Sequence, residues 1–124
     1  MENSKKIFDI VVKTLEDKKA KNIKAIDIRE LTTIASYFII ASGTSVTHIK
    51  SLADNVEEKL IEEGIRPLHI EGYNNARWIL MDYNDVVVHI FHEEDREYYG
   101  LERLWQDGKE IVLNSENDVA INRP

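Results

Sequence analysis

Residues 71–105 read EGYNNARWILMDYNDVVVHIFHEEDREYYGLERLW and hold the strongest structural signal in this chain. Two apolar runs, 78–81 and 86–91, flank the short turn Tyr83-Asn84-Asp85, an arrangement typical of a β-hairpin. The apolar spacing over residues 98–105 then predicts a short aromatic helix. This stretch therefore predicts two antiparallel strands followed by a helix.

Upstream of the hairpin, apolar periodicity alternates between helical and strand spacing. It predicts a helix capped by Ser4, strands over 23–28 and 37–41, a long helix from Thr44 or Ser45 to Glu63, and a strand over 68–71. Gly64 follows the long helix, where a helix C-terminus favours glycine. The succession of strand, long helix and strand favours a right-handed crossover between parallel neighbours.

These elements together predict an α/β (α+β) domain with a mixed sheet of about five strands flanked by helices. A chain of 124 residues has room for one core, so we expect a single domain over residues 1–108. Residues 109–124 have weak periodicity and several asparagines. We expect this C-terminal tail to be partly flexible.

Composition excludes several classes of protein. The chain has no cysteine, which excludes disulfides, thiol catalysis and thiolate zinc sites. No apolar run reaches the roughly 20 residues of a membrane span, and the N-terminus lacks the apolar core of a secretory signal. We therefore expect a cytoplasmic protein with no membrane contact.

The net charge of −7 is unevenly spread, because the first 24 residues hold seven lysines and four acids. An acidic chain is poorly suited to grip nucleic acid through a broad positive face, so we expect no dominant nucleic-acid contact. A basic protein partner suits this charge better. Charge alone is also explained by solubility.

The hairpin stretch closely resembles the C-terminal half of the Iojap or RsfS family of ribosomal silencing factors. The matching positions are Glu71, Gly72, Trp78, Leu80, Asp82, Tyr83, Asp85, Val86, Val87, Val88, His89, Phe91, Arg96, Tyr99, Leu101, Glu102, Leu104 and Trp105. A looser resemblance reaches back to about residue 5 through Asp27-Ile28-Arg29, Tyr37-Phe38-Ile39-Ile40, Gly43-Thr44-Ser45 and His48.

Two positions depart from the family pattern. Ser36 replaces a common aspartate before the Tyr-Phe pair, which removes a charge from that corner. Asn84 replaces the glycine of the hairpin turn. Because asparagine tolerates positive φ better than most residues, the same turn remains feasible.

The resemblance implies a core similar to nucleotidyltransferases and a function without chemistry. Family members bind the large ribosomal subunit through a basic protein on its subunit-joining face, the one usually numbered fourteenth. They thereby block joining of the small subunit and lower translation when nutrients are scarce. Carried over by position, the partner-binding candidates are Glu71, Trp78, Leu80, Asp82, Tyr83 and His89. Trp78, Leu80 and Tyr83 would be anchors, Glu71 and Asp82 acceptors for basic side chains, and His89 a hydrogen-bonding group.

Strand alternation groups some of these candidates. Trp78, Leu80 and Asp82 share one face of their strand, while Val87 and His89 share one face of the next. We expect the helices to leave one sheet face uncovered, so that this group forms an interface patch. The pattern alone is equally compatible with a buried, purely structural Trp78.

A degenerate nucleotidyltransferase, or a nucleotide-binding adaptor, is the alternative reading. The turn Gly43-Thr44-Ser45 suits an anion at a helix start, but no strand carries the Asp-x-Asp pair that holds Mg²⁺. His89 and His92 are three apart, which places them on opposite faces of a strand. We therefore expect no catalytic residue, metal site or cofactor. We also expect a homodimer when the protein is free, because a small sheet with an unprotected edge favours self-association.

Overall fold

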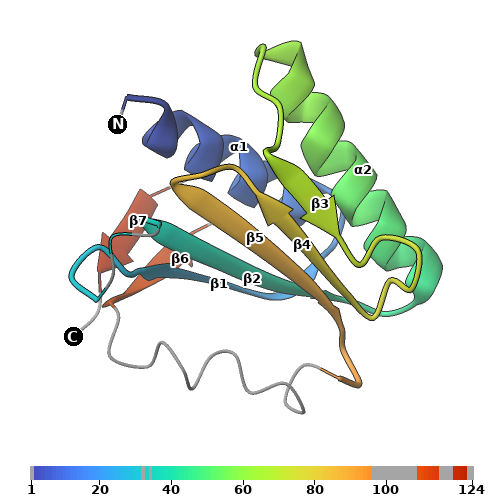
Figure 1. Cartoon of the computed structure of the whole chain (residues 1–124). Coiled ribbons are helices and arrows are strands. Elements are labelled where there is room, and N and C mark those ends of the chain that lie inside the picture. The colour runs from blue at the N-terminus through green and yellow to red at the C-terminus, as the bar shows by residue number, and fades with distance from the viewer. Residues whose placement is uncertain (1, 32, 34, 96–108, 115–118, 123–124) are drawn as a thin grey trace.

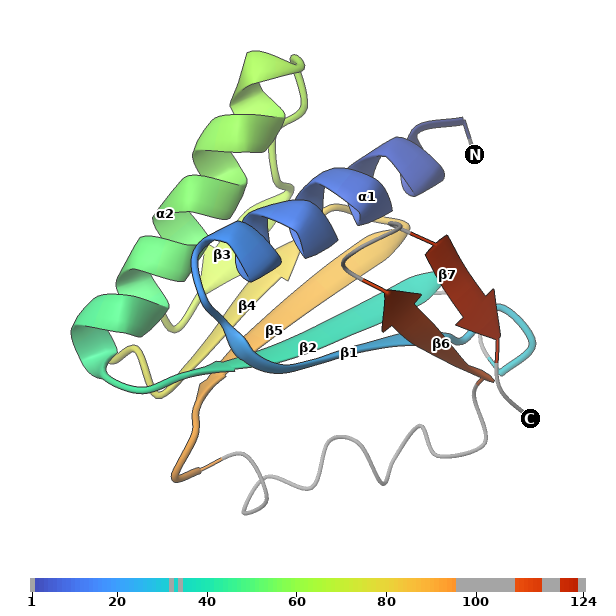
Figure 2. The ribbon, with the colours of Figure 1, turned by 180° about the vertical axis from the view of Figure 1, so that it is seen from behind.

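The computed structural model describes residues 2–31, 33, 35–95, 109–114 and 119–122. Its elements are α1 (Glu2–Asp17), β1 (Lys21–Asp27), β2 (Tyr37–Gly43), α2 (Val46–Glu62), β3 (His69–Glu71), β4 (Trp78–Asp82), β5 (Val86–His92), β6 (Lys109–Asn114) and β7 (Val119–Asn122). The strands form one sheet in the order β3-β4-β5-β2-β1-β6-β7. Both helices pack on the same face of this sheet (Figures 1 and 2).

The predicted mixed α+β fold is confirmed. β2 and β5 pair in parallel, and the other neighbouring strands pair antiparallel. The five expected strands are β1 to β5, and two further strands, β6 and β7, extend the sheet beyond β1. These two strands lie in the segment expected to be a flexible tail, and its mobility stays a prediction. The predicted helix over 98–105 lies outside the described residues.

The predicted crossover between neighbouring parallel strands is wrong in one respect. The strand before α2 and the strand after it, β2 and β3, do run parallel, but β5 and β4 lie between them. All seven residues of β5 are buried, so this strand needs neighbours on both sides. β3 has three half-buried or exposed residues and can occupy the edge.

The main core lies between the helices and the sheet. Residues at helical spacing on both helices are buried there against the sheet: Ile7, Val11 and Leu15 from α1, and Ile49, Leu52, Val56 and Leu60 from α2. Burying one such side chain fully contributes about 1.5–3 kcal/mol. This contact fixes the helices on one face and leaves the other face of β1 to β5 without a described helix.

The predicted helix caps are only partly correct. Ser45 caps α2 as expected, because its hydroxyl accepts a hydrogen bond from the backbone N–H of His48 at 3.0 Å. Ser4 is not a cap, since α1 already begins at Glu2. Its hydroxyl instead donates to the Asp85 carboxylate at 3.0 Å and ties α1 to the hairpin turn.

The hairpin turn takes the predicted form. Asn84 has a φ of 73°, and its N–H donates to the Asp82 carboxylate at 2.8 Å. The N–H of Tyr83 closes the turn on the Val86 carbonyl at 2.9 Å. At the other family departure, the backbone N–H of Ser36 donates to the Asp85 carbonyl at 2.7 Å, so the backbone holds this corner.

Gly72 sits where β3 turns back towards β4. Its φ is +79°, and a Cβ at this position would overlap the Trp78 carbonyl. Gly64, after α2, has a φ of +78°, but a Cβ there would meet nothing within 4 Å. Both positions therefore disfavour a side chain through the backbone, and only Gly72 also forbids one through contact.

We predict that Gly72→Ala lowers the free energy of unfolding by about 2 kcal/mol or more, because strain and overlap add. The matched control Gly64→Ala introduces the strain alone and should cost about 1 kcal/mol. Urea unfolding of both variants measures the difference. Equal losses would show that the approach to Trp78 relaxes without cost.

Candidate functional site

Strand pairing decides which side chains share the sheet face opposite α1 and α2, here called the second face. Trp78 lies opposite Phe91 and Leu80 opposite His89, while His89 also lies opposite Ile40 of β2. Directly paired residues point to the same side of a sheet. The predicted grouping of Trp78, Leu80 and Asp82 with His89 is therefore confirmed.

The centre of the second face is aromatic. The Trp78 ring stacks on Phe91 with centroids 5.1 Å apart, and the His89 ring lies 4.8 Å from Phe38. Trp78, Phe38 and Leu80 are half-buried, whereas Phe91 is fully buried. Trp78 thus packs into a second, smaller cluster and keeps part of its surface accessible, and its role as an interface anchor stays a prediction.

His89 is the polar group at the middle of this cluster. Its side chain is 3% exposed, and its Nδ1 accepts a hydrogen bond from the Trp78 indole N–H at 3.1 Å. The ring proton therefore resides on Nε2, which has no hydrogen-bond partner among the residues that the structure describes. Burial lowers the pKa of His89 to about 4, so the imidazole is neutral at pH 7.

The outer edge of the second face is acidic. Glu71 on β3 lies opposite Leu80, and its carboxylate is 3.0 Å from Nε2 of His69. The Asp82 carboxylate is 3.7 Å from Nδ1 of the same imidazole. Glu71 is exposed and Asp82 is half-buried. Because Glu71 pairs with Leu80 and Asp82 pairs with Val87, both carboxylates border the aromatic centre.

Tyr83 is the one candidate that the structure separates from the others. It is 4% exposed and belongs to the core on the helix side of the sheet. Burial raises the pKa of its hydroxyl above the ordinary value. Five of the six candidates therefore share the second face, and Tyr83 does not. Its anchoring role stays untested.

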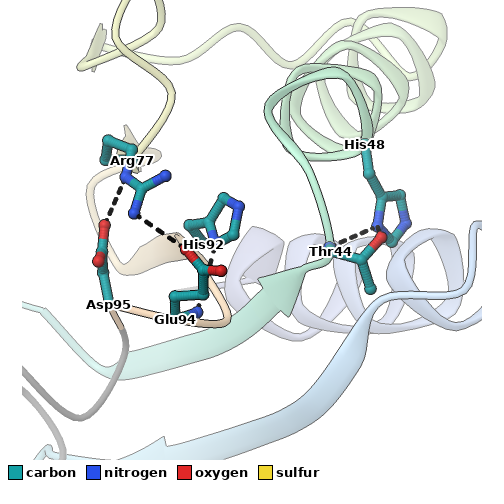
Figure 3. Close-up of polar contacts among 6 residues, drawn as sticks. All are labelled: Thr44, His48, Arg77, His92, Glu94 and Asp95. Carbon is teal, nitrogen blue, oxygen red and sulfur yellow. Dashed lines mark hydrogen bonds and ion pairs between the residues drawn. The ribbon is translucent and has the colours of Figure 1, made fainter.

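A second polar cluster lies where β2 and β5 end (Figure 3). The Arg77 guanidinium contacts Asp95 at 2.6 Å and Glu94 at 3.6 Å. The hydrogen bond from Arg77 lowers the pKa of the Asp95 carboxyl. The N–H of Glu94 donates to His92 Nδ1 at 3.2 Å, so these contacts order the chain as it leaves β5.

In the turn Gly43-Thr44-Ser45, which was expected to suit an anion, side chains of the protein itself already accept backbone N–H hydrogen bonds. The backbone N–H of Thr44 donates to His48 Nδ1 at 3.1 Å, and His48 Nε2 lies 3.0 Å from the Lys18 carbonyl. A pocket of about 520 Å³ beside this turn is lined by Lys21, Asn22 and Thr44 together with the carboxylates of Glu93 and Glu94. Two acids against one lysine disfavour phosphate inside this pocket. The turn therefore serves as a helix cap and as a link to the end of α1.

The arrangement of acids and histidines offers little to a metal ion. Asp85 accepts from Ser4 on the helix side, while Asp82 lies on the second face, so the two carboxylates diverge. Within the described ranges, no three His, Asp or Glu side chains converge as ligands. None of the described helices is long and apolar enough to cross a membrane.

Sequence reasoning missed part of the aromatic centre. Phe38 enters the site because β2 pairs in parallel with β5, which places it beside Val87 and close to His89. Its run, 37–41, is apolar throughout, so no alternation distinguishes its two faces. A covariation signal between the two strands is the kind of observation that would find it.

A family model described as "Ribosomal silencing factor during starvation" matches residues 1–123. The chain belongs to this family. The Bacillus subtilis ribosomal silencing factor is 40% identical over 105 residues, which are 85% of this chain and 89% of that protein. A Chromobacterium violaceum crystal structure matches with a TM-score of 0.80 at 37% identity and covers 82% of this chain and 85% of its own.

The silencing-factor family also has relatives in organelles. The mouse protein named "Mitochondrial assembly of ribosomal large subunit protein 1" is 30% identical over 101 residues. The match covers 79% of this chain and 44% of that protein.

We predict that His89 makes the free energy of unfolding decrease as the pH is lowered. Its folded pKa of about 4 lies below the ordinary 6.5, so the unfolded chain binds the proton first and stability is lost as pH falls. Between pH 7 and pH 5 this group should remove about 2 kcal/mol of unfolding free energy. Urea unfolding of wild type and His89→Gln at both pH values isolates the effect. An equal pH dependence in the two proteins would refute it.

Proposed function

We propose that this chain binds the large ribosomal subunit through its second face and blocks joining of the small subunit. The observation that carries the proposal is the half-buried aromatic centre around Trp78, bordered by the carboxylates of Glu71 and Asp82. Amphipathic aromatic anchors inside a polar rim are typical of protein interfaces. The family description and the name of the mouse relative support the ribosome, and its large subunit, as the target.

The proposed partner is a basic protein on the joining face of the large subunit. The carboxylates of Glu71 and Asp82 would accept hydrogen bonds from its lysine or arginine side chains, and the net charge of −7 would steer the encounter. Trp78 and Leu80 would supply apolar contact. His89 would act mainly by holding the Trp78 ring in place, because its own side chain is buried.

This function requires bulk and affinity, and no chemistry. A compact domain seated on the joining face excludes the small subunit by overlap, provided that its interface outlasts the intersubunit contacts it replaces. In this proposal the protein is not an enzyme, needs no cofactor and acts in the cytoplasm to repress translation under nutrient limitation.

We predict that the pair Glu71→Gln and Asp82→Asn weakens binding to purified large subunits by about tenfold and lowers its salt sensitivity. Asparagine at position 82 keeps an acceptor for the Asn84 N–H, so the turn should persist. The matched control Glu58→Gln with Glu62→Gln changes the same charge on the solvent side of α2. Co-sedimentation measures all three proteins. Wild-type binding by the first pair would place the interface elsewhere.

We also predict a homodimer of the free protein. β3 is a three-residue edge strand with one described neighbour, and it leaves main-chain groups available to a second copy. Light scattering at increasing concentration should approach twice the 14.4 kDa chain mass. A mass that stays at 14.4 kDa at high concentration would contradict this prediction.

A further inference from the structure

Four exposed lysines gather where α1 ends and β1 begins, a group here called the lysine cluster: Lys13, Lys18, Lys19 and Lys21. None of their ammonium groups makes an ion pair with the residues that the structure describes. Lys5 and Lys6, at the other end of α1, are by contrast paired with Asp9 and Glu63. Three of them line a surface pocket of about 550 Å³, whose lining is Lys13, Glu16, Asp17, Lys19, Ala20, Lys21 and Ile23, so lysines outnumber acids there by three to two.

The lysine cluster lies in a segment with an excess of positive charge, although the chain as a whole is acidic. Residues 13–24 hold five lysines and two acids, whereas the whole chain has a net charge of −7. A favourable interaction with the α1 dipole explains a cation in or near the last helical turn. That last turn holds no basic residue, and Lys21 already belongs to β1. The dipole therefore accounts for only part of the cluster.

Lys19 occupies a strained backbone position. Its φ is 68°, and the N–H of Ala20 donates to the Leu15 carbonyl at 2.9 Å, which is the closing bond of a Schellman motif. Glycine is the residue that fits this left-handed position without strain. A lysine in this left-handed conformation, which glycine adopts more easily, suggests that its side chain has a functional role.

The cluster lies at the same end of the sheet as Trp78. Trp78 pairs with Phe91, Phe91 with Ser42, and Ser42 with Lys21, so one cross-strand line joins the two. Three strand spacings separate them, about 14 Å. Within the cluster this line ends at Lys21, and Lys13, Lys18 and Lys19 lie beyond it on α1 and in the turn that follows. A partner seated on Trp78 therefore brings Lys21 first towards whatever lies next to that partner.

We propose that the lysine cluster contacts phosphate groups of the large-subunit ribosomal RNA beside the protein bound by the second face. Flexible lysines serve as point charges for phosphates, and three or four of them form a contact too small to hold RNA alone. The contact would therefore add affinity and orientation only when the second face is docked. This inference rests on the proposed function and adds a second component to its partner.

The first test compares charge-neutral triple variants. Lys13→Gln, Lys19→Gln and Lys21→Gln together should weaken binding to large subunits about tenfold near 100 mM salt. The slope of log affinity against log salt should also become shallower by about two. The control Lys5→Gln, Lys6→Gln and Lys59→Gln removes the same charge from the opposite end of the helices and should change affinity less than twofold. Unchanged affinity and slope in the first variant would overturn the proposal.

The single variant Lys19→Gly separates function from stability. Removing the strained lysine should leave the melting temperature equal or higher, while binding to large subunits becomes weaker. A purely structural Lys19 predicts unchanged binding. Lower stability with normal binding would likewise contradict a recognition role.

The second test identifies the contacted molecule. Because the chain has no cysteine, Lys19→Cys gives a unique attachment point for an iron–EDTA chelate. Hydroxyl radicals generated there should cut large-subunit RNA at a few neighbouring nucleotides, and a chelate on Lys59→Cys should not produce these cuts. Weakened binding by the triple variant without local RNA cleavage would assign the cluster to an acidic protein surface and overturn the RNA contact.

The two proposals fail in distinguishable ways. If wild type does not sediment with large subunits, the proposed function fails, and the lysine contact fails with it. If the variant of Glu71 and Asp82 loses binding while the lysine triple variant binds normally, the proposed function stands and only the RNA contact is wrong.

Discussion

The parallel pairing of β2 with β5 is the contact on which the rest of this structure depends. It joins seven residue pairs, from Tyr37 with Val86 to Gly43 with His92, and the members of each pair lie about two fifths of the chain length apart in sequence. Both strands lie in the middle of the sheet, which is why their sequences are almost continuously apolar. One side of this pair carries the main core with α1 and α2, and the other side carries the centre of the second face.

The two faces place different demands on neighbouring residues. Val86, Val88 and Ile90 need only fill space beneath the helices. The residues between them, Val87 and His89, must pack in a smaller cluster that includes half-buried aromatic rings. The hydrogen bond from the Trp78 indole N–H to His89 fixes the orientation of both rings. The accessible edge of the tryptophan therefore has a defined position on the sheet.

Acidic and basic side chains lie at different sides of the sheet. Glu71 and Asp82 lie at the β3–β4 side of the second face, and the lysine cluster lies where α1 meets β1. The neutral His89 separates these poles without adding charge of its own. On the proposed surface of basic protein and RNA, opposite charges at opposite sides of the domain would favour one orientation.

The sequence by itself determined the local elements. Alternation and turn chemistry predicted the hairpin and its Asn84 turn, and helical spacing predicted α2 with its caps, because these depend on residues close in the chain. Alternation also predicts that Tyr83 and Asp82 point to opposite faces of the sheet. The family resemblance placed both in one candidate set and so did not make this distinction. Only the tertiary structure decided that the β4–β5 hairpin lies between β2 and β3 and that Phe38 joins the site. Periodicity states which side of a strand is buried, but it carries no information on which strand lies beside it. That choice is made by packing between distant segments, where the fully buried β5 requires neighbours on both sides.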